Sequence, residues 1–253
     1  MSVPRALFPL LSLALLLGLW EVAALWGGGR VLPTPGAVAL ALAREAESGA
    51  LVHHLGVTLL RVLAAFVLAL SVGVALGVPM GRSLLCDRLF GPWLVFFLNL
   101  PALVVIVLAY VWFGLTEAAA VGAVAVNKIP NTIVLVRAGA RTIDEGLIEM
   151  ARVYRMSRLD RLRHVLLPHL APTIAAAARS GLALIWKIVL VVELLGRGDG
   201  VGFQINLLFQ TFDVAGILAY SVAFVVVILL LEYGVLQPIE RRCSRWRRSH
   251  AEA

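Results

Sequence analysis

The stretch EMARVYRMSRLDRLRHVLLP, residues 149–168, is a long, strongly charged segment in the middle of an apolar chain. It carries seven charged side chains: Glu149, Arg152, Arg155, Arg158, Asp160, Arg161 and Arg163. The chain around it has 253 residues, is 61% hydrophobic and 15% charged, and has a mean hydropathy of +0.94. Soluble domains carry roughly 25% charged residues, so lipid must be the solvent for much of this chain. The charged stretch is therefore expected to be a water-exposed segment between membrane spans.

Six apolar segments are long enough to cross a bilayer, which takes about 20 residues in a helix. They lie at 6–26, 55–78, 89–113, 118–136, 174–195 and 214–236. The expected fold class is an all-α membrane protein with about six transmembrane helices. The first segment begins with Arg5, as a signal peptide does, but it is long, lacks a small-x-small cleavage site and contains Trp20 and Trp26 as interface anchors. We therefore expect it to be retained as a helix.

Basic residues predict the orientation. With the N-terminus inside, 15 of the 22 Lys and Arg side chains fall in cytoplasmic segments, whereas Arg30, Arg44 and Arg197 fall outside. Lys and Arg collect on the cytoplasmic side of membrane proteins, so both termini are expected in the cytoplasm. The net charge of +7 is then explained by basic residues that orient the chain in the membrane, and it does not indicate nucleic-acid binding. The two cysteines, Cys86 and Cys243, lie in these basic flanks and are expected to be free thiols without metal-ligand spacing.

The chain is predicted to be a single membrane domain. Residues 1–54 hold the first span and an outer segment, 55–236 form the core bundle with the charged loop at 138–171, and 237–253 form a basic cytoplasmic tail. In the outer segment, glycines and prolines up to Pro35 break helical structure. Val38, Leu42 and Ala46 then predict a short amphipathic helix, which either lies on the outer membrane face or packs on the bundle.

The charged loop is predicted to contain two short helices. In the first, Leu147, Ile148, Ala151 and Tyr154 share one face, and Asp144 caps the start. Such a pair could dock in a groove on a partner and transmit force to the adjoining spans. The alternative is a basic loop that only fixes topology.

The second helix is predicted to start at Ser157, which forms a capping box with Asp160. Leu159, Leu162 and Leu166 share its apolar face. Pro168 is expected to end it before the next span.

This loop resembles the EAA loop of ABC importer permeases. That motif has Glu-Ala-Ala, a Gly after three residues and a hydrophobic-x-Leu-Pro end after nine more; here Glu149 and Ala151 match its start, and Val165, Leu167 and Pro168 match its end. Met150 replaces Ala, and Arg155 stands where the family has the Gly that permits a tight turn. An Arg with positive φ costs roughly 1 kcal/mol, so either the turn has another shape or Arg155 contacts the partner. The resemblance implies that a set of loop residues couples the chain to an ATPase: Glu149, Met150, Ala151, Arg155, Ser157, Leu159 and Pro168.

The resemblance extends along the chain to the permeases of the nitrate, sulfonate, taurine and bicarbonate branch. The similar segments are RVLPTPGAV (30–38), TLLRVLAAFVLALSVGVALGVPMG (58–81), YVWFGLTEAA (110–119) and IVLVVELLGRGDGVGFQI (188–205). The resemblance implies a pore of two permease copies, a homodimer, in the bacterial inner (cytoplasmic) membrane. It also implies an ABC ATPase dimer inside and a periplasmic or lipid-anchored solute-binding protein outside. The cargo implied is a small anion, with a pyrimidine-like vitamin precursor as the alternative.

The chain itself is expected to bind no cofactor, because ATP and Mg belong to the partner ATPase. It has no G-x-x-x-x-G-K-[ST] loop, and the glycine-rich segment at 196–202 lacks the lysine of one, so this segment is expected to be an outer loop. It also lacks the H-E-x-x-H and G-x-S-x-G motifs, so we do not expect an enzyme.

Ionisable and polar residues inside membrane spans are candidates for the translocation pathway. They are Asn99, Asn127, Lys128, Asn131, Trp186, Lys187 and Glu193. Lys187 and Glu193 are six residues apart, which places them poorly for pairing on one helix. We hypothesise that Lys128 or Lys187 supplies a positive field for an anion; the alternative is that each lysine pairs with a carboxylate or snorkels.

Four further polar residues are expected to be structural. Arg61 and Glu21 fall near the ends of spans, which tolerate charge. His53 and His54 are expected at the outer interface rather than in a metal site, because adjacent histidines on a helix do not face one ion. A self-sufficient secondary transporter or channel stays the alternative function, and transport without ATP would distinguish it.

Overall fold

The computed structural model describes residues 7–28 and 31–238, and every regular element in these ranges is helical. The expected all-α class is therefore confirmed. Predictions that concern Arg5, Arg30, Cys243 and the basic residues of the tail fall outside the described residues.

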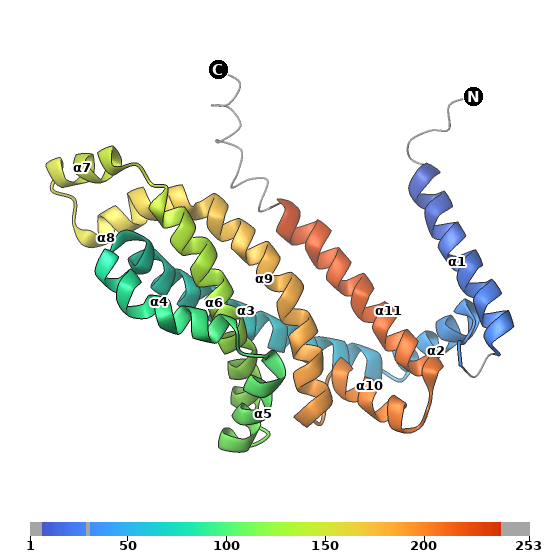
Figure 1. Ribbon diagram of the computed structural model, residues 1–253. Helices are drawn as coiled ribbons and strands as arrows, with labels where there is room; N and C mark the ends of the chain where they lie inside the picture. Colours follow the sequence, from blue (N-terminus) through green and yellow to red (C-terminus); the bar gives the residue numbers. More distant parts are fainter. Residues whose placement is uncertain (1–6, 29–30, 239–253) are drawn as a thin grey trace.

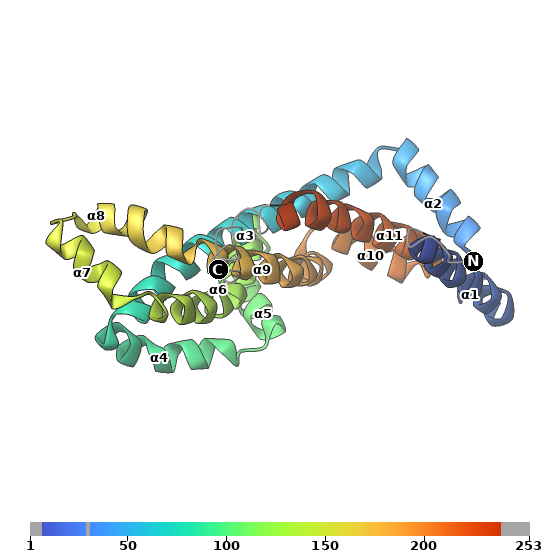
Figure 2. The same cartoon turned by 90° about the horizontal axis from the view of Figure 1, so that it is seen from above.

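Three long helices form the centre of the molecule: α3 (Ala50–Arg82), α6 (Glu117–Arg141) and α9 (Leu167–Gly196). Figures 1 and 2 show α4 and α5 along one flank of this centre and α10, α11 and α2 toward the other, with α1 farthest away. The short helices α7 and α8 stand together at one end, which we call the α7–α8 end. The flanking elements are α1 (Leu7–Gly27), α2 (Pro35–Glu47), α4 (Leu84–Leu98), α5 (Ala102–Phe113), α7 (Glu145–Val153), α8 (Arg158–Arg161), α10 (Val201–Gln210) and α11 (Val214–Leu231).

Four helices of the described chain are long and apolar enough to cross a membrane. They are α3, α6, the continuous helix Leu159–Gly196 and Val214–Val235. These match four of the six predicted segments. The bent pair α4–α5 counts as a fifth if it forms one span, and the apolar part of α1, Leu11–Gly27, is shorter. Whether α1 forms a sixth span, and which end faces the cytoplasm, stay predictions.

The predicted third span, 89–113, is broken in the structure. It consists of α4 and α5, whose axes differ by 95°. The helix ends at Asn99, whose side-chain amide donates to the Val95 carbonyl at 2.8 Å, and Pro101 precedes the first residue of α5. Proline cannot donate a backbone hydrogen bond and disfavours a helical conformation in the residue before it. The break therefore falls between Asn99 and Pro101, and the segment still counts as one candidate span if the bent pair is taken together.

The outer amphipathic segment forms α2 and packs on the bundle. The Thr34 hydroxyl caps the helix by accepting from the Ala37 amide at 3.2 Å. Val38 is buried and Leu42 joins the buried cluster around Tyr220, but Ala46 is exposed. The Tyr220 hydroxyl also donates to the Glu45 carboxylate at 2.7 Å. Of the two alternatives for this helix, packing on the bundle is the one observed.

Glycines on one face of α3 allow its close approach to α6. A Cβ on Gly73 would lie 2.5 Å from the Thr132 side chain, and a Cβ on Gly81 would lie 2.5 Å from the Ala140 Cβ. Small residues at such positions let membrane helices approach closely enough for van der Waals contact between backbones. This packing fixes α6, and with it the loop that follows α6.

Replacing Gly81 with valine is expected to separate α3 from α6. The added Cβ would also lie 2.7 Å from the Arg137 carbonyl, which belongs to the backbone and cannot rotate away. Overpacking of this kind costs roughly 1–3 kcal/mol, so the thermal unfolding midpoint of the purified chain should fall. Gly56→Val in the same helix is the matched control, because nothing lies within 4 Å of its Cβ position. Equal midpoints for the two variants would contradict the close packing.

Candidate functional site: a helix pair at one end of the bundle

The charged stretch forms the two helices that the sequence predicts. The Asp144 carboxylate caps α7 by accepting from the Gly146 amide at 2.9 Å. The Ser157 hydroxyl accepts from the Asp160 amide at 3.1 Å and donates to the Asp160 carboxylate at 2.6 Å. Asp is one methylene shorter than Glu, and here its carboxylate bonds the Ser157 hydroxyl instead of a backbone amide. Both predicted capping residues, Asp144 and Ser157, therefore accept from a backbone amide, but Asp160 does not complete the reciprocal half of the predicted capping box.

One side of the pair is buried against the membrane helices. Ile148 and Ala151 of α7 lie in a buried cluster with Val136, Ala140, Ile143, Val165 and Leu170, which come from the ends of α6 and α9 and from their connections. Two of the four residues predicted for the inner face of α7 are thus fully buried, and Leu147 packs against the cluster. This shared core packs α7 directly against the ends of α6 and α9.

Tyr154 is the exception to the predicted inner face of α7. Its side chain is 75% exposed, because α7 ends at Val153 and the chain turns away at Tyr154. The periodicity of the helix therefore no longer applies at Tyr154.

Arg155 occupies the turn between the helices with a φ of 50°. The Arg155 amide donates to the Arg152 carbonyl at 2.9 Å, and the Met156 amide donates to the Ala151 carbonyl at 3.0 Å. This pair of hydrogen bonds is the Schellman motif, which needs a left-handed residue after the helix end and is usually built with glycine. The turn therefore keeps the geometry of a glycine turn although arginine occupies it.

Replacing Arg155 with glycine is expected to stabilise the protein by roughly 1 kcal/mol, because glycine adopts positive φ without the Cβ strain of arginine. Arg152→Gly, three residues earlier inside α7, is the control with the opposite sign, since glycine inside a helix costs roughly 1 kcal/mol. The thermal unfolding midpoints of the two variants should move in opposite directions. A fall for both would mean that the Arg155 side chain makes a stabilising contact that outweighs the strain.

The other side of the pair presents apolar side chains away from the bundle. Val153 is 80% exposed and Leu159 71% exposed, and Met150 and Tyr154 are exposed near them. We call these four residues the exposed cap. Glu149 and Arg155 are exposed as well. Sequence reasoning missed Val153, although its position three residues after Met150 on a helix could have revealed it.

The second helix does not end at Pro168. It continues from Leu159 to Gly196 as one helix of 38 residues. A π-helical turn at Leu162–Leu166 precedes the proline, and the Leu167 amide donates to the Leu162 carbonyl. The wider π-helical turn lies where the Pro168 ring would clash with the carbonyl four residues earlier, so the proline is accommodated without ending the helix. The prediction was therefore wrong on this point, and the helix pair is joined to α9 without a break.

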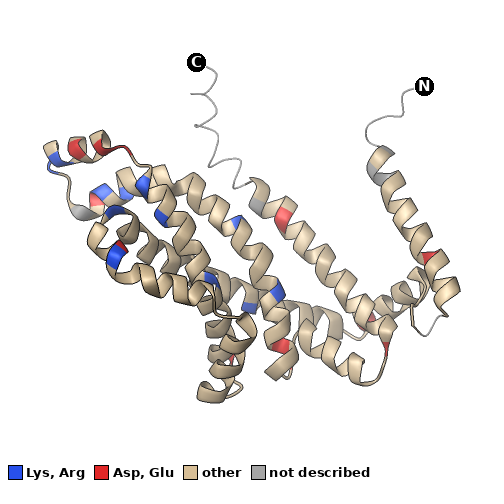
Figure 3. Ribbon diagram, in the orientation of Figure 1, with Lys and Arg blue, Asp and Glu red and all other residues tan. Residues whose placement is uncertain are grey.

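Charged groups tie the α7–α8 end together. Arg82 at the end of α3 pairs with Glu145 at 2.9 Å, and Asp87 of α4 pairs with Arg137 of α6 at 2.7 Å. The latter is a charge contact without hydrogen-bond alignment. Asp87 also pairs with Arg141 at 2.5 Å. Figure 3 shows that Lys and Arg gather at this end of the molecule.

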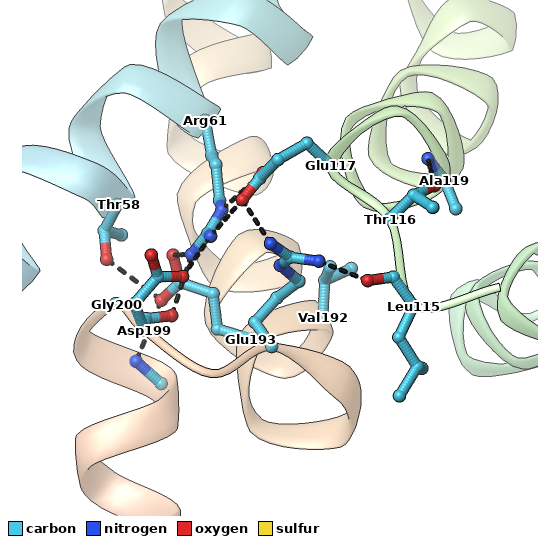
Figure 4. A network of polar contacts seen from close by, with 12 residues as sticks. Thr58, Arg61, Leu115, Thr116, Glu117, Ala119, Val192, Glu193, Asp199 and Gly200 are labelled. Atoms are coloured by element: carbon cyan, nitrogen blue, oxygen red, sulfur yellow. Dashed lines mark hydrogen bonds and ion pairs between the residues drawn. The ribbon is translucent and has the colours of Figure 1, made fainter.

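Two of the seven pathway candidates are buried. Glu193 is fully buried in an ion cluster, where it accepts from Arg61 and from Thr58, each at 2.9 Å (Figure 4). Lys128 is 3% exposed between α6 and α9, with its Cε 3.3 Å from the Cβ position of Gly181. Within the described residues, Glu193 forms no ion pair with Lys128 or with Lys187.

The ion cluster joins elements that are far apart in the sequence. Besides Glu193, Arg61 bonds Glu117 at the start of α6 at 2.9 Å and the Asp199 carbonyl at 2.8 Å. Arg197 also pairs with Glu117. Arg61 is thus buried in a network of ion pairs that joins α3, the start of α6 and the segment after α9. The glycine-rich segment 196–202 wraps around this cluster, because the Gly202 amide donates to Glu193 at 2.9 Å.

The other pathway candidates lie on the surface or near it. Lys187 is exposed and its Nζ lies 5.3 Å from the Trp186 ring centroid, while Trp186 packs on Phe224 of α11. Asn127 and Asn131 are half-buried on α6. Asn99 lies at the break between α4 and α5. The structure therefore brings three of the seven candidates, Asn127, Asn131 and Lys187, to the accessible surface of the central helices.

The adjacent histidines do not share a site. The His54 Nδ1 accepts from the Gly200 amide at 3.0 Å, which ties α3 to the glycine-rich segment. Within residues 7–28 and 31–238, no group of three or more His, Cys, Asp or Glu side chains is placed to hold a metal ion. Cys86 is a free thiol.

Comparison with known proteins identifies relatives along nearly the whole chain. Residues 69–236 match the family described as binding-protein-dependent transport system inner membrane component. The putative aliphatic sulfonates transport permease protein SsuC of Escherichia coli (strain K12) is 31% identical, covering 91% of this chain and 88% of the relative. The same-named protein of Bacillus subtilis (strain 168) is 29% identical over 95% of this chain and 88% of the relative. The taurine transport system permease protein TauC of E. coli is 26% identical, covering 77% of this chain and 70% of the relative.

Solved structures share the fold. An inward-facing MetNI methionine ABC transporter structure aligns with a TM-score of 0.60 and 22% identity, covering 77% of this chain and 94% of that chain. An amino acid ABC transporter solved with histidines gives a TM-score of 0.63 and 21% identity, covering 79% of this chain and 97% of that chain. The named relatives are permease proteins, so the chain is a membrane component of a transporter and not its catalytic subunit. On the family match and the identity to SsuC, the chain belongs to the binding-protein-dependent transport system inner membrane component family.

Proposed function

We propose that this chain is the permease subunit of an ATP-binding-cassette importer that moves a small organic anion into a bacterial cell. The exposed cap carries this proposal, because four apolar side chains point away from a firmly anchored helix pair. Exposed apolar patches on an otherwise charged surface mark sites of protein association. The partner is a cytoplasmic ATPase subunit that receives the pair in a groove.

The proposed mechanism follows from how the pair is anchored. Closure of an ATPase dimer on ATP draws together the two helix pairs of a permease dimer. Because α8 continues into α9 without a break, and α7 packs on the ends of α6 and α9, the long helices tilt with the pair. The pore then opens outward to a solute-binding protein, and hydrolysis returns it inward.

The orientation proposed places the α7–α8 end in the cytoplasm of a cell with a bacterial inner membrane. Basic side chains gather at that end (Figure 3), as the positive-inside rule requires. The ion cluster around Arg61 and the glycine-rich segment then face the outside, where the binding protein docks. The pore is proposed to be a homodimer, since one chain supplies one helix pair.

A sulfonate is the cargo class that the relatives favour, because two of them are named for aliphatic sulfonates and one for taurine. The experiment reconstitutes the permease with a cognate ATPase and solute-binding protein into liposomes. We expect ATP-dependent accumulation of labelled ethanesulfonate. Competition by taurine, nitrate, bicarbonate and a pyrimidine defines the cargo. Accumulation by the permease alone, without ATP, would instead establish a self-sufficient transporter.

A further inference from the structure

One side of the α6–α9 pair is left uncovered by the rest of the described chain. The two helices are antiparallel neighbours, because Lys128 of α6 meets Gly181 of α9 and Gly139 of α6 meets Thr173 of α9. The third central helix, α3, packs on the opposite side. Gly73 of α3 contacts Thr132 of α6, and other α3 residues share a buried cluster with Ile185 of α9.

Helix geometry identifies the residues on the uncovered side. The contact residues of α6 and α9 are Lys128 and Gly181. Thr132 and Ile185 lie four positions after them, and both face α3. Positions one before and three after a contact residue lie on the other side, because each residue advances the helix by 100°. In α6 these positions are Asn127 and Asn131, and in α9 they are Ser180 and Leu184.

The uncovered side continues along α9 with exposed residues at helical spacing. Ala183, Lys187 and Val191 are all exposed and lie four residues apart. We call Asn127, Asn131, Ser180 and Lys187 the polar strip. Figures 1 and 3 show α6 and α9 side by side, with basic positions along α9.

The polar strip cannot face lipid. It lies within the two helices that are long and apolar enough to span a membrane. In the described part of the chain, the side chains of Asn127 and Asn131 have no hydrogen-bond partner. Within the same ranges Lys187 pairs with no carboxylate, and its ammonium group contacts only the Trp186 ring. Unsatisfied amides and a charge at membrane depth are costly unless they line a cavity that contains water or a ligand. Such groups are expected to meet water or a ligand in the assembled transporter.

We propose that the polar strip is a binding station for an oxyanion head group, such as a sulfonate, inside the passage between two copies of this chain. Lys187 supplies the positive charge, and the side-chain amides of Asn127 and Asn131 supply neutral donors. The Ser180 hydroxyl, which donates to the Ala177 carbonyl at 3.2 Å, borders the station without a free donor. The neighbouring basic residue of α9, Arg179, is already paired with Glu232 of α11 at 3.3 Å. A single unneutralised cation in a passage attracts an anion yet releases it, as transport requires.

A second copy of the chain encloses the polar strip. The presence of this second copy rests on the proposed function, in which the pore is a homodimer. The station itself does not depend on ATP. Its test therefore uses the full chain alone in lipid nanodiscs, so that failure of the station and failure of ATP-driven transport are separate results.

The experiment measures the reactivity of a cysteine placed one helical turn before Lys187. Ala183→Cys is introduced into a chain carrying Cys86→Ala and Cys243→Ala. Its labelling rates are compared for the anionic reagent 2-sulfonatoethyl methanethiosulfonate and the cationic reagent 2-(trimethylammonio)ethyl methanethiosulfonate. Ala46→Cys, exposed on α2, gives the reference ratio, and Leu230→Cys on α11 tests lipid exposure.

We expect Ala183→Cys to favour the anionic reagent about tenfold over the reference ratio, since a charge in a narrow low-dielectric passage concentrates counter-ions. Added ethanesulfonate should slow this labelling. Lys187→Gln should remove both effects, Lys187→Arg should keep them, and Arg44→Gln, which removes an exposed charge on α2, should change nothing.

Two results would overturn the station. Absence of labelling by either reagent would place Ala183 in lipid or in protein. A reference-like ratio, or one unaffected by Lys187→Gln, would show that the passage has no anion preference at Lys187.

Discussion

Arg61→Met is expected to lower the free energy of unfolding by roughly 3–5 kcal/mol, the usual cost of removing one partner from a buried ion pair. Glu193 is fully buried and Arg61 is 4% exposed, so the remaining carboxylate could not reach water. It would keep bonds from Thr58 and from the Gly202 amide but lose its only cation in the cluster. Unfolding of the purified chain by titration with a denaturing detergent would measure the loss.

The double variant Arg61→Met/Glu193→Met is the informative control. Removing both charges leaves no buried ion without a counter-charge, so the double variant should be more stable than Arg61→Met alone. Arg44→Met removes an exposed arginine and should leave stability within about 0.5 kcal/mol of the parent. If Arg61→Met unfolded like the parent chain, the cluster would not be holding the ends of α3, α6 and α9 together.

Val153→Asp is expected to weaken coupling to the ATPase and so to reduce ATP-driven transport strongly, while leaving the fold intact. The side chain is 80% exposed, so the carboxylate stays in water when the chain is alone. In a complex with the ATPase the same carboxylate would be buried without a partner, which costs roughly 2 kcal/mol or more and weakens binding about thirtyfold. Co-purification of the ATPase with a tagged permease and uptake of ethanesulfonate in liposomes should fall together.

Val31→Asp is the matched control for that experiment. Val31 is similarly exposed but precedes α2, far from the α7–α8 end (Figure 1). It should keep both the complex and transport. Full ATPase binding by Val153→Asp would remove the exposed cap as the docking surface, and a lower unfolding midpoint for this variant would show that the loss arises from folding.

The candidate site was predictable where its determinants are local. The caps at Asp144 and Ser157 follow from side chains that bond amides two or three residues away. The Arg155 turn keeps a glycine-like φ because Ile148 and Ala151 before it and Val165 after it must reach the same buried cluster. Tyr154 was misplaced because the helical period holds only while the helix lasts.

Residue patterns alone predict the helical class, the apolar segments and the position of the charged helix pair, because hydropathy, capping and periodicity act over a few residues. The packing of the helices was needed to place Glu193 beside Arg61, 132 residues away, in a buried cluster. It also decided that α8 runs on through Pro168 into α9, and that Asn127, Asn131 and Lys187 share a side. These outcomes depend on which helices pack together, and local sequence patterns do not encode the rotation of one helix against another.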